Sequence, residues 1–125
     1  MMKYLLDSNA IIALVMNDDA NLVARAANCD EGEMVTSAIA YAEVAYGSAN
    51  ERPPALDQLS AFVEEVPVLD FDARAAKAYA TMPFKRGSYD RLIAAHAVSL
   101  GLTVVTDNEA DFADVPGLKV ENWTV

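Results

Sequence analysis

The chain has 125 residues, of which 54% are hydrophobic and only one is a cysteine. This length predicts a single domain, spanning residues 1–125, that buries enough surface to fold without disulfides. Nine basic residues against nineteen acidic ones give a net charge of −10, which argues against nucleic-acid binding through a broadly basic surface.

We expect neither a membrane-spanning helix nor a signal peptide from this sequence. No uninterrupted apolar run approaches the roughly 20 residues that a membrane-spanning helix needs, so no membrane partner is expected. Residues 1–16 lack the basic start and the small-residue cleavage site of a signal peptide. Cys29 has no second cysteine to pair with, which favours a reducing cytoplasm as the location.

Hydrophobic periodicity and capping residues divide the chain into alternating strands and helices. The expected strands are short apolar runs at residues 4–6, 33–36, 68–71, 102–106 and 118–121. The first expected helix is capped by Ser8 or Asn9, and the next two cover about residues 20–28 and 37–46. A fourth begins at Pro53 or Pro54, a fifth covers 73–81 and a sixth begins at Ser88 or Asp90. A helical turn is expected near 109–112. This order predicts an α/β fold in which a mostly parallel sheet has helices on both faces. Ligands of such folds bind at the carboxyl ends of the strands, where the strand order reverses.

Four carboxylates interrupt segments that are otherwise apolar: Asp7, Glu43, Asp90 and Asp107. Asp7 and Asp107 each follow a predicted strand directly, and neighbouring parallel strands would bring the two side chains together. Glu43 is the only charge in its predicted helix, on the face that should point inward. Asp90 opens a helix whose following residues are apolar. We therefore expect the four acids to converge at one edge of the sheet.

Each acid also has a purely structural interpretation. Asp7 and Asp90 are suited to cap the helices that follow them, and Asp107 before an asparagine is typical of a turn. Glu43 has no capping role, and a glutamate is seldom buried without a partner. Carboxylates that share a pocket repel one another and take up protons unless a cation lies between them. Oxygen ligands without histidine or cysteine suit Mg²⁺ or Mn²⁺ rather than Zn²⁺.

The remaining reactive residues support weaker hypotheses. His96 is interpreted as a helix-surface residue and Cys29 as an unreactive residue in a turn. Arg86 and Arg91, together with Lys85, bracket Asp90 in the sequence. These three cations are either solvated surface charges or a guide for phosphate beside the acidic site.

Five motifs, in order over nearly the whole chain, resemble those of the PIN-domain ribonucleases, specifically the VapC toxins of bacterial toxin–antitoxin operons. They are Leu5–Asn9, Val35–Gly47, Tyr89–Ala97, Val104–Asn108 and Val115–Trp123. The resemblance implies a three-layer PIN-like fold and Mg²⁺-dependent endoribonuclease activity, with Asp7, Glu43 and Asp90 as the core acids. It also implies inhibition by a cognate VapB-like antitoxin that inserts a segment into the active-site groove, contact with operator DNA only through that antitoxin, and commonly a homodimer.

The chain departs from the family pattern in three places. Ser8 stands where threonine is usual, which keeps the hydroxyl group. The fourth family position often falls two residues after the last threonine of its strand, at Asn108 here, whereas Asp107 lies one residue earlier. The segment that precedes Asp90 is shorter than in many members, which affects the contacts made there with substrate or with a second subunit.

The expected reaction is hydrolysis of an RNA phosphodiester, with Asp7 and Asp90 as metal ligands and Glu43 holding or deprotonating a water. Asp107 or Asn108 would complete the metal shell. We assign substrate binding or positioning to the polar residues beside these acids: Ser8, Asn9, Thr106, Asn108, Arg86 and Arg91. Two rivals are a phosphohydrolase of small phosphate esters and a non-catalytic module whose acids pair with a partner's arginines. Asn9 stands where the aspartyl-phosphate type of phosphohydrolase needs an aspartate.

Overall fold

The fold is built on a sheet of five strands, all of them parallel. The computed structural model describes every residue from 1 to 125. The strands are β1 (Tyr4–Leu6), β2 (Met34–Ser37), β3 (Val68–Leu69), β4 (Thr103–Val105) and β5 (Lys119–Glu121). Their order in the sheet is β3-β2-β1-β4-β5, so the chain adds β2 and β3 on one side of β1 and then β4 and β5 on the other. The strand order therefore reverses between β1 and β4, where this fold class places its ligands.

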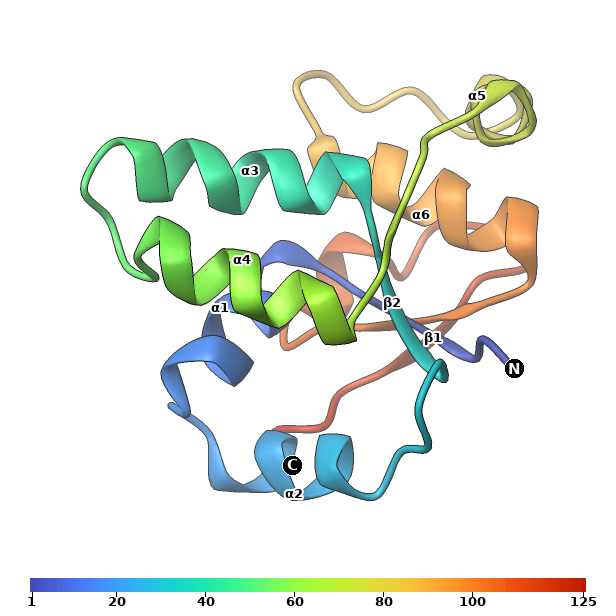
Figure 1. The fold of residues 1–125 in the computed structure, drawn as a ribbon. Coiled ribbons are helices and arrows are strands. Elements are labelled where there is room, and N and C mark those ends of the chain that lie inside the picture. The colour runs from blue at the N-terminus through green and yellow to red at the C-terminus, as the bar shows by residue number, and fades with distance from the viewer.

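Helices cover both faces of the sheet, which confirms the predicted α/β architecture of three layers (Figure 1). They are α1 (Ser8–Met16), α2 (Ala20–Ala27), α3 (Ala38–Ala49), α4 (Leu56–Glu65), α5 (Ala73–Ala80), α6 (Tyr89–Leu100) and the short 3₁₀ turn η1 (Glu109–Asp111). In Figure 1, α5 lies against α6 above the strands, α1 and α2 lie below them, and α3 and α4 run side by side. No helix has the length and apolar character needed to cross a membrane.

Two predicted helix boundaries are wrong. Helix α3 passes through Gly47 and continues to Ala49, because Gly47 keeps a helical conformation and the helix ends instead where the Asn50 side-chain amide binds the Tyr46 carbonyl at 2.7 Å. Helix α4 begins at Leu56 rather than at the two prolines before it. Residues such as glycine and proline indicate where a helix can begin or end, but the surrounding packing determines the boundary that is observed.

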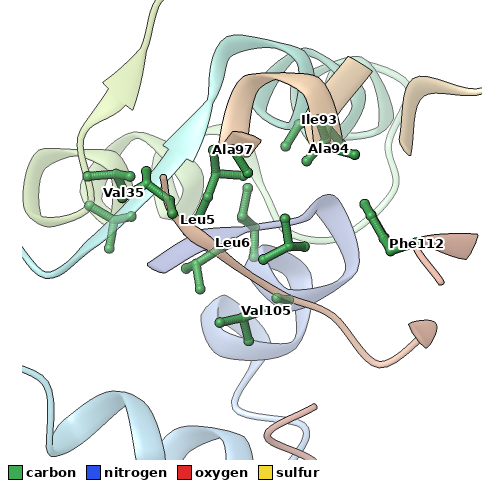
Figure 2. Close-up of a cluster of buried hydrophobic side chains, with 14 of the residues drawn as sticks. Leu5, Leu6, Val35, Ile93, Ala94, Ala97, Val105 and Phe112 are labelled. Atoms are coloured by element: carbon green, nitrogen blue, oxygen red, sulfur yellow. The ribbon is translucent and has the colours of Figure 1, made fainter. Parts of the chain in front are cut away.

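The core lies where strands β1, β2 and β4 meet helix α6 (Figure 2). Leu5, Leu6 and Val105 are fully or almost fully buried, and each such side chain contributes about 1.5–3 kcal/mol to folding. Two buried alanines of α6, Ala94 and Ala97, face this cluster, and their small side chains let the helix backbone lie close to the strands. Helix α6 is thereby fixed against the sheet.

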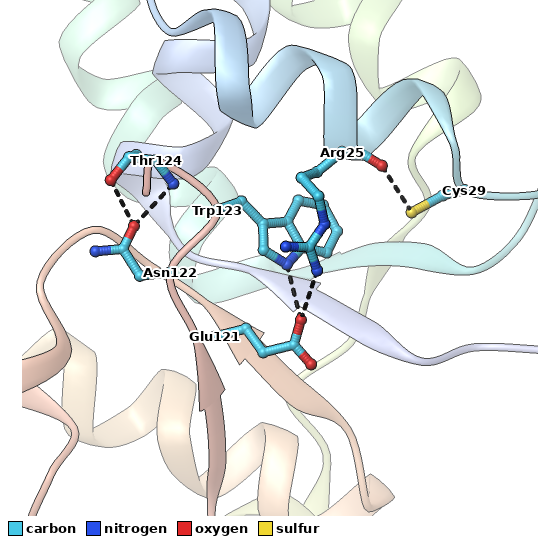
Figure 3. Close-up of polar contacts among 6 residues, drawn as sticks. All are labelled: Arg25, Cys29, Glu121, Asn122, Trp123 and Thr124. Atoms are coloured by element: carbon cyan, nitrogen blue, oxygen red, sulfur yellow. Dashed lines mark hydrogen bonds and ion pairs between the residues drawn. The ribbon is translucent and has the colours of Figure 1, made fainter.

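The C-terminal segment is held by Trp123, which is 1% exposed. Its indole Nε1 donates a hydrogen bond of 2.9 Å to Glu121 Oε1, the same oxygen that Arg25 of α2 reaches at 3.1 Å (Figure 3). The Arg25 guanidinium also lies 5.1 Å from the centre of the indole ring. Because the Thr106 amide donates to the Glu121 carbonyl at 3.1 Å, this anchor also holds the end of β4 in place.

Candidate active site

Asp7 lies at the carboxyl end of β1 and is 3% exposed. Its Oδ1 accepts a hydrogen bond of 2.8 Å from the Ala10 amide, so Asp7 itself caps α1, and the expected caps Ser8 and Asn9 are the first residues of the helix. Asn9 is exposed and makes no side-chain hydrogen bond within the chain. The structural interpretation of Asp7 as a helix cap is thus correct.

Strand pairing brings Asp7 to the end of β4. Leu6 pairs with Val105, and the Asp7 amide donates to the Val105 carbonyl at 3.2 Å. Burial raises the pKa of the Asp7 carboxyl to about 6, and the charges of Asp90 and Asp107 add to this effect. Hydrogen bonds from the Thr106 hydroxyl and the Ala10 amide oppose the shift. Asp7 is therefore a buried acid without a positively charged partner.

Glu43 reaches the same edge of the sheet from the middle of α3. Its Oε1 accepts a hydrogen bond of 3.2 Å from the Ser8 hydroxyl, which ties α3 to the start of α1. The side chain is half-buried, and this burial raises the pKa of the Glu43 carboxyl. Ser8, predicted as a positioning residue, follows Asp7 directly in the sequence and contacts Glu43 in the structure.

Asp90 lies in the first turn of α6 and is not its cap. Ser88 caps this helix, because its hydroxyl accepts a hydrogen bond of 3.1 Å from the Arg91 amide. Burial raises the pKa of the Asp90 carboxyl to about 6, and Asp111 adds to the shift through a hydrogen bond and its charge, followed by the charge of Glu43. The carboxylate of Asp90 is therefore not used for capping, and it lies in the neighbourhood of two other acids, Asp111 and Glu43.

The acid that contacts Asp90 is Asp111, which the sequence analysis did not single out. Asp111 ends the 3₁₀ turn η1, and Asn108 fixes its orientation because the Asn108 amide Nδ2 donates to Asp111 Oδ2. Asp107 is exposed and lines a small recess beside Asn9 and Trp123 instead. Asn108 directly precedes the turn predicted near residues 109–112, and its i, i+3 spacing to Asp111 is the sequence signal that could have identified this acid.

The donor set suits a hard divalent cation, because every candidate ligand is a carboxylate or amide oxygen. Asp7 and Asp90 both have a raised pKa, as expected for acids that lack a compensating positive charge. As the side chains lie, no three Asp, Glu, His or Cys residues are close enough together to form a complete metal site. An ion bound by Asp7 and Asp90 would therefore need water molecules as its remaining ligands, and Mg²⁺ usually retains several.

The arginines near Asp90 differ in their exposure. Arg86 is exposed and lines a recess beside Glu43 and Asp90. Arg91 is 2% exposed, and its Nη2 forms an ion pair of 3.0 Å with Asp114 Oδ2. The hypothesis that Arg91 guides phosphate is therefore wrong, since the helix turns this side chain into the protein. Arg91 instead connects the start of α6 to the segment that follows η1.

His96 is also buried, contrary to the prediction of a helix-surface residue. Its ring is 2% exposed, and Nδ1 lies 2.9 Å from the hydroxyl of Ser37, the cap of α3. Burial lowers the pKa of His96, so the ring is neutral near pH 7. His96 packs edge-on against Phe71 at 5.5 Å between ring centres. It joins α6 to α3 and lies apart from the acids.

A recess of about 640 Å³ lies away from the acids. It is lined by apolar side chains of α1, α2, β2 and α4, among them Leu14, Val23, Met34 and Phe62. None of the candidate acids lines it, so the chemistry is assigned from the carboxylates and not from the size of the cavity.

Comparisons with known proteins agree with this geometry. Residues 4–118 match the model of the PIN domain family. A tRNA(fMet)-specific endonuclease VapC from Shigella flexneri is 35% identical over 99% of this chain and 100% of its own length. Ribonuclease VapC2 from Haemophilus influenzae is 30% identical over 98% of this chain and 99% of its own length.

Solved structures of the same kind share the fold. VapBC2 from Rickettsia felis, bound to a DNA fragment from its promoter, contains a chain that superposes with a TM-score of 0.85 at 25% identity, covering 98% of this chain and 99% of that chain. DNA-bound VapBC from Salmonella typhimurium contains one with a TM-score of 0.79 at 32% identity, covering 98% and 99%. By sequence and by fold, this chain belongs to the PIN domain family and, within it, to the VapC branch.

Proposed function

We propose that this chain is the toxin of a toxin–antitoxin pair and that it acts as a Mg²⁺-dependent endoribonuclease, with Mn²⁺ as an alternative ion. The observation that carries the proposal is the approach of Asp7 and Asp90 where the strand order reverses, each with its pKa raised to about 6. Relatives that match over their full length and are named as VapC ribonucleases support the same activity.

Asp7 and Asp90 would hold the ion, and Asp111 would complete the acidic site beside Asp90. We assign to Asp111 the fourth position, for which the sequence offered Asp107 or Asn108, because Asp111 interacts with Asp90 and Asn108 donates to Asp111. When bound, the cation lowers the pKa of water and stabilises negative charge on the phosphoryl oxygens.

Glu43 is placed to take part in proton transfer. Its carboxyl has a raised pKa and is held by the Ser8 hydroxyl, so it is suited to accept the proton of a water that attacks phosphorus. The water oxygen forms the new bond to phosphorus, the bond to the leaving oxygen breaks, and the leaving oxygen takes up a proton. Arg86, exposed in the adjoining recess, is placed to bind the phosphate next to the cleaved bond.

A VapB-like antitoxin is the proposed protein partner, and it would inhibit the enzyme by inserting a segment over the acids. The chain would then contact operator DNA only through the antitoxin, and a homodimer is its proposed assembly. The Rickettsia felis and Salmonella typhimurium structures, both VapBC with DNA, support the antitoxin as a partner. The free thiol of Cys29 agrees with a reducing cytoplasm as the location.

The test is cleavage of total RNA by the purified chain without antitoxin, in Mg²⁺ and in EDTA. We expect discrete fragments in Mg²⁺, no cleavage in EDTA, and none from Asp90→Asn. Asp18→Asn, a change at an exposed acid outside the site, is the matched control and should cleave as the parent does. Undiminished cleavage in EDTA or by Asp90→Asn would refute the proposal.

A further inference from the structure

Residues 109–115, which we call the acidic turn, form backbone hydrogen bonds only with near neighbours in the chain, such as the bond of 3.3 Å from the Val115 amide to the Phe112 carbonyl. Residues three apart in so tight a turn lie on the same side of it. Phe112 and Val115 are accordingly both buried in the core, while Asp111 and Asp114 form a second pair with the same spacing. Side chains, and not backbone pairing, therefore fix the acidic turn to the rest of the protein.

The two acids of the turn meet two consecutive residues in the first turn of α6. Beyond the effect of burial, Asp111 raises the pKa of Asp90 through a hydrogen bond and its charge. Asp114 Oδ2 lies 3.0 Å from Nη2 of Arg91, the residue that follows Asp90. Two carboxylates repel each other when both are ionised, whereas the neighbouring contact joins opposite charges. The attractive contact is thus placed beside the repulsive one.

Two ion pairs connect the acidic turn to the rest of the chain, and they differ in strength. Lys85 Nζ lies 3.7 Å from Asp111 Oδ1 with both side chains partly exposed, and such surface pairs contribute little to stability. Arg91 is buried, and its hydrogen bond lowers the pKa of the Asp114 carboxyl. Because Nε and Nη1 of Arg91 have no partner, Asp114 is the only anion that this guanidinium contacts. Loss of one partner from a buried pair costs far more than loss of a surface pair.

We propose that Arg91 and Asp114 are positioning residues: their ion pair holds the acidic turn against the start of α6 and so keeps Asp111 beside Asp90. The inference rests on the proposed function where it concerns the cation, and it assigns Arg91 no contact with cation or RNA. Without the pair, the repulsion between Asp90 and Asp111 is unopposed, and Asp111 moves away from Asp90. The acidic site then offers a cation fewer oxygens, so its affinity for Mg²⁺ falls.

Isothermal titration with Mg²⁺ in the absence of RNA tests this role. Arg91→Met and Asp114→Asn should each weaken Mg²⁺ binding about tenfold, as is typical when a residue that supports metal ligands is changed. Asp114→Glu keeps the carboxylate and should restore the affinity. The two substitutions change the charge in opposite directions, so their direct electrostatic effects on a cation would have opposite signs. A loss of affinity in both variants therefore reports the position of Asp111.

The Asp111→Asn background shows whether the pair acts through Asp111. If it does, Asp114→Asn should cause no further loss of Mg²⁺ affinity there, because the two changes remove the same contribution. Amide hydrogen exchange in EDTA should be faster over the acidic turn in both pair variants. Val66→Ala is the stability control, since it removes buried methyl groups beyond the end of α4 and should lower thermal stability with Mg²⁺ affinity unchanged.

Four results would overturn the inference: unchanged Mg²⁺ affinity in both pair variants, tighter binding by Arg91→Met, a further tenfold loss in the Asp111→Asn background, or an equal loss in Val66→Ala. The last would assign the effect to lower stability. If the pair variants lose Mg²⁺ affinity but the native chain cuts no RNA, the proposed function fails and the positioning role stands. If the native chain cuts RNA and the pair variants bind Mg²⁺ as it does, only the positioning role fails. A native chain that binds no Mg²⁺ would overturn both.

Discussion

The Ser8 hydroxyl donates a hydrogen bond of 3.2 Å to Glu43 Oε1, and this contact joins the first turn of α1 to the middle of α3. Ser8 directly follows Asp7, the cap of the same helix. The two residues Asp7 and Ser8 therefore position two of the candidate acids: Asp7 is held as the cap of α1, and Glu43 is held by the Ser8 hydroxyl.

Removal of this hydroxyl should disturb catalysis more than stability. Ser8→Ala is expected to lower kcat about tenfold, because Glu43 loses the contact that orients it, and to lower the free energy of unfolding by only about 1 kcal/mol. Ser8→Thr retains the hydroxyl and should restore the rate. Single-turnover cleavage and urea unfolding measure the two effects, and an unchanged rate in Ser8→Ala would show that Glu43 does not depend on Ser8.

Asp7→Asn should stabilise the metal-free protein while it abolishes cleavage. Asn keeps an oxygen that can accept the Ala10 amide, and it removes a buried charge whose pKa is raised from 3.8 to about 6. The shift corresponds to a stabilisation of up to about 3 kcal/mol at pH 7. Urea unfolding in EDTA measures this difference. A variant less stable than the parent would mean that the Asp7 charge is compensated in the folded protein.

The same shift predicts how stability depends on pH. Since the folded pKa of Asp7, about 6, lies above its ordinary value of 3.8, the folded state keeps this proton at a pH where the unfolded state has lost it. Stability therefore falls as pH rises from about 4 to about 6, and the loss is complete above that range. Asp7→Asn should lack this part of the pH dependence, so thermal melts of the two proteins in EDTA should differ most at neutral pH and converge near pH 4.

Asp111 and Asp107 should respond differently to the same change. Asp111→Asn removes the charge beside Asp90, so we expect Mg²⁺ affinity to fall about tenfold and cleavage to fall about 100-fold. Asp107→Asn changes an exposed side chain that does not line the recess at Asp90 and should leave both nearly unchanged. Isothermal titration with Mg²⁺ gives a readout that does not depend on cleavage. The reverse ranking would return the fourth position to Asp107.

The Arg91–Asp114 ion pair provides a test of the packing at the start of α6. Arg91 is buried, and its Nε and Nη1 have no hydrogen-bond partner, so Asp114 is its only acceptor. Asp114→Asn should therefore destabilise the protein by about 1–3 kcal/mol, because a buried cation is left without its anion. Arg91→Met removes the charge and the unpaired donors together and should cost less. Urea unfolding ranks the two variants, and equal losses would contradict this explanation.

Much of the fold could be predicted from the sequence because its signals are local. The apolar runs that form β1 and β4, the helical stripe that includes Ile93 and Ala97, and the parallel sheet implied by their alternation are all present in the structure. The positions of Asp7 and Thr106 follow as well, since each comes directly after a strand and parallel strands end at the same edge.

Contacts between distant segments could not be predicted in this way. Arg91 and His96 are buried because of the way α6 is oriented about its own axis as it packs on the sheet. A rotation of the helix by one residue would change which of its side chains are exposed. That Asp111 and not Asp107 meets Asp90 depends on the path of a short 3₁₀ turn, whose direction is set by Asn108 and by the burial of Phe112. The sequence by itself determined the type of candidate ligand, carboxylate and amide oxygens at the ends of parallel strands, because residue type and strand position are local properties. Only the tertiary structure decided which acids lie close together, because the distance between them depends on packing contacts between segments far apart in the sequence.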